Sequence, residues 1–162
     1  MARRARAVVG EVSDSHPSLD FLLVADRAEA VNGKLYMMGG GWDRLGVVDF
    51  NQPVNFSLAL GVVVPWNAAN DEHHVHIELR TEDGMVIDPQ MDVSVVVGRP
   101  AFAARGQSFR AVLAANATFR LPAPGAYELV AHLAVTARKR TVFYAEQVQA
   151  FGPATPAGPA RA

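Results

Sequence analysis

Side chains that could bind a metal ion crowd into one short segment, which begins at Glu72 and reads EHHVHIE. If this segment is a β-strand, alternate residues point to the same side, with successive side chains about 7 Å apart. The candidate ligands on that shared face are Glu72, His74, His76 and Glu78. Imidazole and carboxylate groups can ligate zinc, but a solvated strand face has the same composition. We therefore predict no bound metal and no cofactor, and keep a small-ligand or metal-binding site on this strand as the alternative function.

Patterns for other kinds of chemistry are missing from the sequence. There is no cysteine, which excludes thiolate nucleophiles, disulfides and cysteine-ligated metals. No serine stands in a Gly-x-Ser-x-Gly motif. The run Gly39, Gly40 and Gly41 lacks the Gly-Lys-Ser/Thr ending of a phosphate-binding loop, and it fits a twisted or bulged strand better. The sequence therefore predicts a protein that is not an enzyme.

Length and charge narrow the class of protein further. A chain of 162 residues, half of them hydrophobic, has the size of one domain and can bury a core. The net charge of -1 gives no overall field toward nucleic acid or an anionic membrane, and no apolar run reaches the roughly 18 residues that span a bilayer. We expect no membrane partner and a cytoplasmic location. Arginine clusters at Arg3 to Arg6, Arg99 to Arg110 and Arg138 to Arg140 leave a nucleic-acid accessory role as a third reading.

Turn signals divide the chain into short strand-like segments. Residues 1–18 and 152–162 are polar or rich in Pro, Gly and Ala, which predicts flexible tails around one domain at residues 19–151. Runs of β-branched and aromatic residues within it predict an all-β, antiparallel β-sandwich of seven to nine strands. The predicted strands are residues 19–28, 34–42, 54–64, 73–81, 85–87, 93–97, 108–120, 126–136 and 142–151. Residues 100–105 are predicted to form a short turn of helix or a loop, and residues 138–140 a hairpin tip.

The pair Asn32-Gly33 lies between two apolar runs, which is a strong signal for a type I′ β-hairpin. This turn pairs Val31 with Lys34 and, counting back along both arms, Asp26 with Gly39. One face of the hairpin then collects Leu22, Val24, Asp26, Ala28, Ala30, Leu35 and Met37. We expect Asp26 to be buried there and to accept hydrogen bonds from backbone amides freed by a bulge in the glycine run.

Two stretches of the chain resemble known proteins. The succession Asp26-Arg27-Ala28, Asn32-Gly33-Lys34-Leu35-Tyr36 and Gly39-Gly40-Gly41-Trp42-Asp43 is similar to the N-terminal signature of a bacterial family catalogued as a domain of unknown function. The similarity covers residues 19–150 or thereabouts. Pro124-Gly125 followed by Tyr127 resembles the corner of immunoglobulin-like sandwiches, where a tyrosine packs on the core and its hydroxyl bonds to the backbone. The resemblance implies an immunoglobulin-like plan and carries no catalytic residues.

Large amphipathic side chains indicate a protein partner. Tyr36, Met38 and Trp42 fall on the hairpin face opposite the apolar one, and Trp66 follows a strand end. Such residues are enriched at protein interfaces, although core packing is favoured for both tryptophans. We expect a non-enzymatic protein-interaction or assembly module that binds a protein partner or a second copy through an exposed edge or the Trp42 face.

Overall fold

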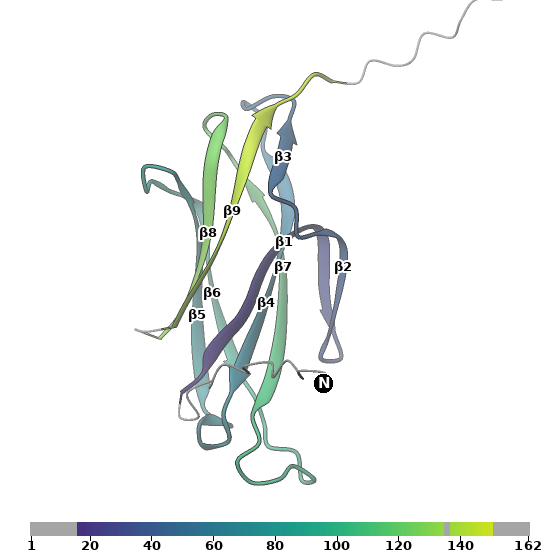
Figure 1. Ribbon diagram of the computed structural model, residues 1–162, viewed down its shortest axis with the longest axis vertical. Coiled ribbons are helices and arrows are strands. Elements are labelled where there is room, and N and C mark those ends of the chain that lie inside the picture. Colours follow the sequence, from purple (N-terminus) through teal and green to yellow (C-terminus); the bar gives the residue numbers. More distant parts are fainter. Residues whose placement is uncertain (1–15, 135–136, 151–162) are drawn as a thin grey trace, which may run out of the picture.

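Nine strands and one turn of 3-10 helix form the regular structure of the computed structural model, in which residues 16–134 and 137–150 are described (Figure 1). The elements are β1 (Ser18–Val31), β2 (Lys34–Gly40), β3 (Arg44–Val47), β4 (Val54–Val64), η1 (Trp66–Ala68), β5 (Glu72–Thr81), β6 (Val86–Val96), β7 (Phe109–Phe119), β8 (Gly125–Leu133) and β9 (Ala137–Gln147). The predicted tails lie outside the described residues, apart from residues 16–18. No helix in the described ranges is long and apolar enough to cross a bilayer.

The strands form two sheets that pack face to face. The first sheet has the order β2-β1-β4-β7 and is antiparallel throughout. The second has the order β3-β9-β8-β5-β6, and here β3 runs parallel to β9. The predicted all-β sandwich is therefore confirmed, with one departure from antiparallel pairing at β3 and β9. Its immunoglobulin-like plan stays a prediction.

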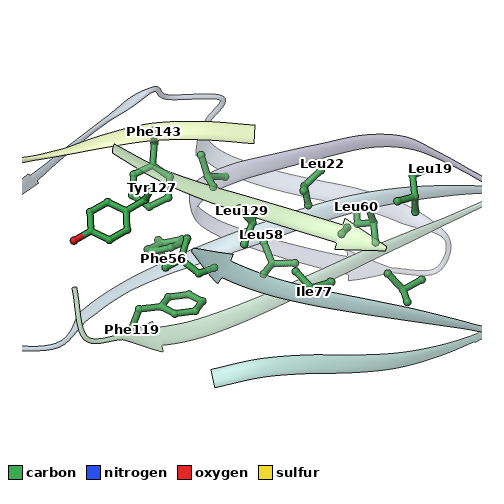
Figure 2. Close-up of a cluster of buried hydrophobic side chains, with 14 of the residues drawn as sticks. Leu19, Leu22, Phe56, Leu58, Leu60, Ile77, Phe119, Tyr127, Leu129 and Phe143 are labelled. Carbon is green, nitrogen blue, oxygen red and sulfur yellow. The ribbon is translucent and has the colours of Figure 1, made fainter. Parts of the chain in front are cut away.

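Apolar side chains from both inner faces meet between the sheets (Figure 2). Along β4 the even-numbered residues from Phe56 to Val64 are almost completely buried, and Leu129 and Leu133 of β8 face them from the other sheet. Alternate residues of a strand point to opposite sides, so these sequences fill one core from two sheets. Phe119 and Leu121 close the core at the end of β7.

β2 and the part of β1 that pairs with it, from Ala25 to Val31, form a hairpin that folds back over the outer face of β4 and β7 and so makes a third layer. Figure 1 shows the layers from left to right, with β5, β8 and β9 first, then β1, β4 and β7, then the hairpin. Ala59 of β4 is fully buried beneath it, in one cluster with Ala25 and Ala28 of the hairpin itself, and Leu35 and Met37 of β2 pack against this cluster. Phe21 lies over Gly61 so closely that a Cβ there would be 2.5 Å from the ring. The small side chains of the sheet thus let the hairpin approach.

Most predicted strands are confirmed. The observed strands differ from the predicted ones at β3, β6 and the start of β9. The segment at β3 was not predicted, and residues 85–87 and 93–97 belong to the single strand β6. Residues 138–140 lie in β9 rather than at a hairpin tip, because β8 ends at Leu133 and β9 already begins at Ala137; residues 135–136 lie outside the described residues. Residues 100–105 form turns and loop, without a helix.

Candidate interaction surfaces

The turn at the tip of the hairpin is the predicted type I′ turn. Asn32 and Gly33 have φ angles of 51° and 72°, the left-handed values that this turn requires. Val31 pairs with Lys34, and the remaining pairs follow the predicted register to Ala25 and Gly40. The turn therefore decides which side chains of the hairpin face outward.

Tyr36 and Met38 lie on the outer side of the third layer, as predicted. Their exposed fractions are 56% and 72%, and their cross-strand partners are Glu29 and Arg27. Glu29 and Arg27 form an ion pair at 2.8 Å. The four side chains line a shallow groove that also touches Leu35 and Met37. This mixed aromatic, thioether and charged composition is typical of interface residues.

Asp26 is exposed, so the prediction that it is buried is wrong. The apolar face expected around it is split, because Leu22 and Val24 face the core between the sheets, whereas Ala28, in the hairpin, packs in the separate cluster with Ala59 on the opposite side of the first sheet. Asp26 lies where β1 passes from one environment to the other. Its carboxylate accepts no hydrogen bond from the described residues, and the hairpin register contains no bulge.

The glycine run serves the twist of the hairpin. Gly39 and Gly41 have φ angles of 57° and 77°, and the Gly41 amide donates to the Val24 carbonyl at 2.7 Å. A Cβ on Gly39 would lie 2.2 Å from the Asp26 carboxylate, whereas Gly40 pairs with Ala25 in ordinary strand conformation. These contacts explain the glycines by geometry alone, which agrees with the predicted twisted strand.

Trp42 does not lie on the exposed hairpin face. It packs edge-to-face on Phe56 and Phe143, with ring centroids 5.7 and 5.4 Å apart, and so follows the core alternative. The chain has left β2 by then, so the alternation of the hairpin no longer applies to it. Trp66 lies in η1, with Phe109 at 6.0 Å and the Arg99 guanidinium 5.0 Å above its ring. Of the four predicted interaction residues, Tyr36 and Met38 are the exposed ones.

The histidine strand does not gather its predicted ligands around one point. His74 bonds to Ser94 at 3.1 Å, and His76 bonds through Nδ1 to Asp92 at 2.8 Å. Glu72 is exposed at the start of β5. Among the described residues, no group of three or more His, Cys, Asp or Glu side chains is arranged to hold a metal ion. His74 and His76 are therefore each hydrogen-bonded to a residue of the neighbouring strand β6.

Glu78 is a charged side chain buried on the outer face of the second sheet. It is only 6% exposed and contacts Arg80, the His132 Nε2 at 3.3 Å and the His76 Nε2 at 4.0 Å. Burial raises the pKa of Glu78, but the hydrogen bond and charge of Arg80, helped by His132 and His76, outweigh it and hold the pKa below its usual 4.5. The Arg80 Nε is buried without a hydrogen-bond partner among the described residues, but the Glu78 carboxylate itself is paired within the fold, so we assign the network to stability.

Tyr127 forms the predicted corner. Its side chain is buried beside Phe143, with the rings stacked at 5.7 Å, and its hydroxyl donates to the Ala123 carbonyl at 2.5 Å. Burial raises the pKa of Tyr127 above 10.0, against a smaller opposite effect of the Ala123 hydrogen bond. Tyr127 thus ties the loop before β8 to the core, a structural role as predicted from the sequence.

Most of the described arginines in the predicted clusters are paired within the fold. Arg138 and Arg140 both contact Glu128, at 3.4 and 3.0 Å, and Arg110 contacts Asp20 at 2.7 Å. Arg3, Arg4 and Arg6 lie outside the described residues. Pairing with carboxylates leaves these side chains less charge to offer to phosphates.

One surface that the sequence analysis missed is the free edge of β7. This strand ends the first sheet and pairs with β4 over eleven consecutive residues without a register shift. Its odd-numbered residues face the core but are only partly buried: Ala111, Leu113, Ala115 and Ala117. β6, which ends the second sheet, contacts β7 and also leaves Met91 and Val93 partly exposed. The sandwich is therefore open along one apolar flank.

The other sheet edges carry features that discourage pairing. β3 has four residues, and β2 has seven and ends in two glycines. β6 contains Pro89 and two aspartates, and its pairing with β5 shifts register. Proteins use short strands, prolines, charges and irregularities to prevent edge-to-edge association. β7 has none of these between Arg110 and Phe119, which is a signal that the sequence AVLAANATF already contained.

Fold and surfaces together define the class of protein as an all-β, two-sheet sandwich with a folded-back hairpin and one unprotected edge. A family model described as a family of unknown function, DUF6941, matches residues 20–145, so the chain belongs to this family. The predicted membership of a family of unknown function is thereby confirmed. No curated protein and no solved structure matches the chain.

Proposed function

We propose that the protein is a non-enzymatic assembly module in which two copies pair through the edges of their β7 strands. The observation that carries this proposal is the eleven-residue β7 edge, which lacks proline, glycine and charge between Arg110 and Phe119. Unpaired backbone amides and carbonyls along such an edge can form a ladder with a second strand. A cytoplasmic location in a bacterium, expected from the sequence, stays a prediction.

A second copy fits this edge better than an unrelated strand because β7 is compatible with itself. An antiparallel pair centred on Ala114, the midpoint of β7, sets Arg110 opposite Thr118 of the second copy and Val112 opposite Asn116. The two arginines then lie about 27 Å apart along the strands, so no like charges meet. Pairing also covers the partly exposed core residues of both flanks, which is a favourable burial of apolar surface.

The test is the mass of the full chain in sedimentation velocity as its concentration rises from micromolar to millimolar. We expect a monomer of 17.4 kDa that converts to a species of twice this mass and no larger through β7. Ala115→Lys places an ammonium on the flank, where it reaches water in the monomer and is buried in the dimer, so it should weaken dimerisation at least about tenfold.

Two matched substitutions identify the surface. Ala30→Lys makes the same chemical change at an exposed position of the hairpin and should leave dimerisation unchanged. Met38→Lys tests the Tyr36 and Met38 face, the other interaction surface expected from the sequence. A dimer that Met38→Lys dissociates and Ala115→Lys does not would move the interface to the hairpin and contradict the proposal.

A further inference from the structure

The loop between β6 and β7 presents an aromatic side chain to solvent. Phe102 is 93% exposed, the highest value of any large hydrophobic residue in the described part of the chain. Two small residues, Ala101 and Ala103, flank it, so nothing shields the ring. An exposed aromatic ring forgoes a large favourable burial, and such side chains are typical anchors when they enter a pocket on a partner.

The base of this loop is held in place. The Arg99 guanidinium donates twice to the Trp66 carbonyl, at 3.0 and 2.7 Å, and stacks over the Trp66 ring. Two tight turns follow, in which Ala103 donates to the Pro100 carbonyl at 3.0 Å and Gln107 to the Ala104 carbonyl at 3.2 Å. A loop ordered in advance loses less conformational entropy when its anchor binds.

A depression with matching chemistry lies at the opposite end of the sandwich. β6 runs from the turn after β5 to the Phe102 loop, and β7 runs back from that loop to the segment before β8 (Figure 1). The Phe102 loop therefore lies at one pole of the molecule, and the turn after β5 and the segment before β8 lie at the other. The depression measures about 470 Å³. Its apolar lining includes Met85, Pro122, Ala123 and Pro124, and the exposed acidic residues Glu82 and Asp83 also line it.

We propose that Phe102 of one copy enters this depression on the next copy. The charges of the two poles are complementary, because Arg105, which has no ion-pair partner among the described residues, follows Phe102 closely, and exposed Glu82 and Asp83 border the depression. An aromatic anchor surrounded by opposite charges combines burial at the centre with steering and register at the rim. The occupant of the depression is therefore a second copy of this chain.

The contact is heterologous, since two different surfaces meet. Repetition of such a contact builds a ring or an open chain instead of a closed two-fold dimer. The inference rests on the proposed assembly role but uses neither β7 nor the flank. Pairing through β7 alone stops at two copies. The contact between the Phe102 loop of one copy and the depression of the next continues beyond two, so the mass of the largest species distinguishes the two modes.

The experiment uses the full chain with Ala115→Lys, which weakens β7 pairing, and measures mass against concentration by sedimentation velocity. We expect species larger than a dimer at high concentration. Phe102→Ala, which removes the anchor, and Ala123→Trp, which fills the depression, should each weaken this association at least about tenfold. Circular dichroism and a urea melt of each variant verify that it is folded.

Mixing the two variants gives the decisive outcome. Phe102→Ala keeps its depression and Ala123→Trp keeps its anchor, so an equimolar mixture has one intact contact and should form a 1:1 dimer and nothing larger. Charge exchange is the second arm: Arg105→Glu and Glu82→Arg should each weaken association, and the double variant should restore it. A mixture that stays monomeric, or association that survives Phe102→Ala, would overturn this inference and leave the β7 proposal intact.

Discussion

Glu78 makes the stability of the second sheet depend on pH, because its buried carboxylate lies at the centre of an ionic network on the outer face. Its carboxylate is held between Arg80, His132 and His76 while it is almost completely buried. Because the folded-state pKa of Glu78 lies below the usual 4.5, the ionised form contributes stability that is fully present above pH 4.5 and is lost as the pH falls through the lower folded-state pKa.

Glu78→Gln should therefore reduce the free energy of unfolding by about 1–3 kcal/mol at pH 7, since it leaves Arg80 without its charged partner. The difference from the wild type should shrink as the pH falls below 4.5. Urea unfolding at pH 7 and at pH values below 4.5 measures both effects. Glu72→Gln, an exposed position on the same strand, is the control and should change stability by less than about 0.5 kcal/mol at either pH. A difference that is independent of pH would contradict the role assigned to the Glu78 charge.

At the scale of elements, the pairing of β1 with β4 depends on a position that has no side chain. Phe21 occupies the space that a side chain on Gly61 would need. Gly61→Ala should destabilise the protein by about 1–3 kcal/mol, because the new methyl group overlaps the ring. The measurement is a double-mutant cycle in urea with Phe21→Leu, whose smaller side chain leaves room for the methyl group.

The cycle distinguishes steric overlap between the new methyl group and the Phe21 ring from a general effect of alanine on β4. If Phe21 is the obstacle, Gly61→Ala should cost at least about 1 kcal/mol less in the Phe21→Leu background than in the wild type. Equal costs in both backgrounds would contradict this and show that the Phe21 ring is not what excludes a side chain at position 61.

Sequence patterns predicted the elements well where the determining contacts are local. The Asn32-Gly33 turn fixes the hairpin register by itself, and the alternation of β5 and β8 identifies their inward faces. β3 escaped prediction because a four-residue strand containing Gly46 has little pattern, and its partner β9 lies about a hundred residues away. Asp26 was misplaced for a similar reason, since the alternation of one strand does not reveal that the strand passes from one layer to another.

At the scale of the whole molecule, the candidate surfaces were only partly predictable. Tyr36 and Met38 were placed correctly because the turn determines their face, whereas Trp42 follows the end of β2 and joins the core. The open flank depends on β6 and β7 being the last strands of their sheets. Sheet order is a property of pairings distant in sequence, so the absence of charge from AVLAANATF acquires a meaning only when β7 is known to be an edge.

The flank and the two poles give the molecule distinct directions in which copies can meet. The hairpin covers the outer face of the first sheet, and the ionic network around Glu78 occupies the outer face of the second. The long edge of β7 is left with unpaired backbone and partly exposed core residues. Pairing between two β7 edges is therefore the assembly contact that we propose for this sandwich.

The most direct test of this claim is the distance between spin labels in the dimer, because the chain contains no native cysteine to interfere. Labels on Thr118→Cys and, in a separate sample, on Arg110→Cys lie at equal distances from Ala114. Double electron–electron resonance should then give a separation of about 27 Å between backbone positions in both samples, since each label is four residues from the two-fold axis. Unequal separations would place the axis elsewhere on β7, and the absence of any dipolar coupling at dimer-forming concentrations would contradict β7 pairing.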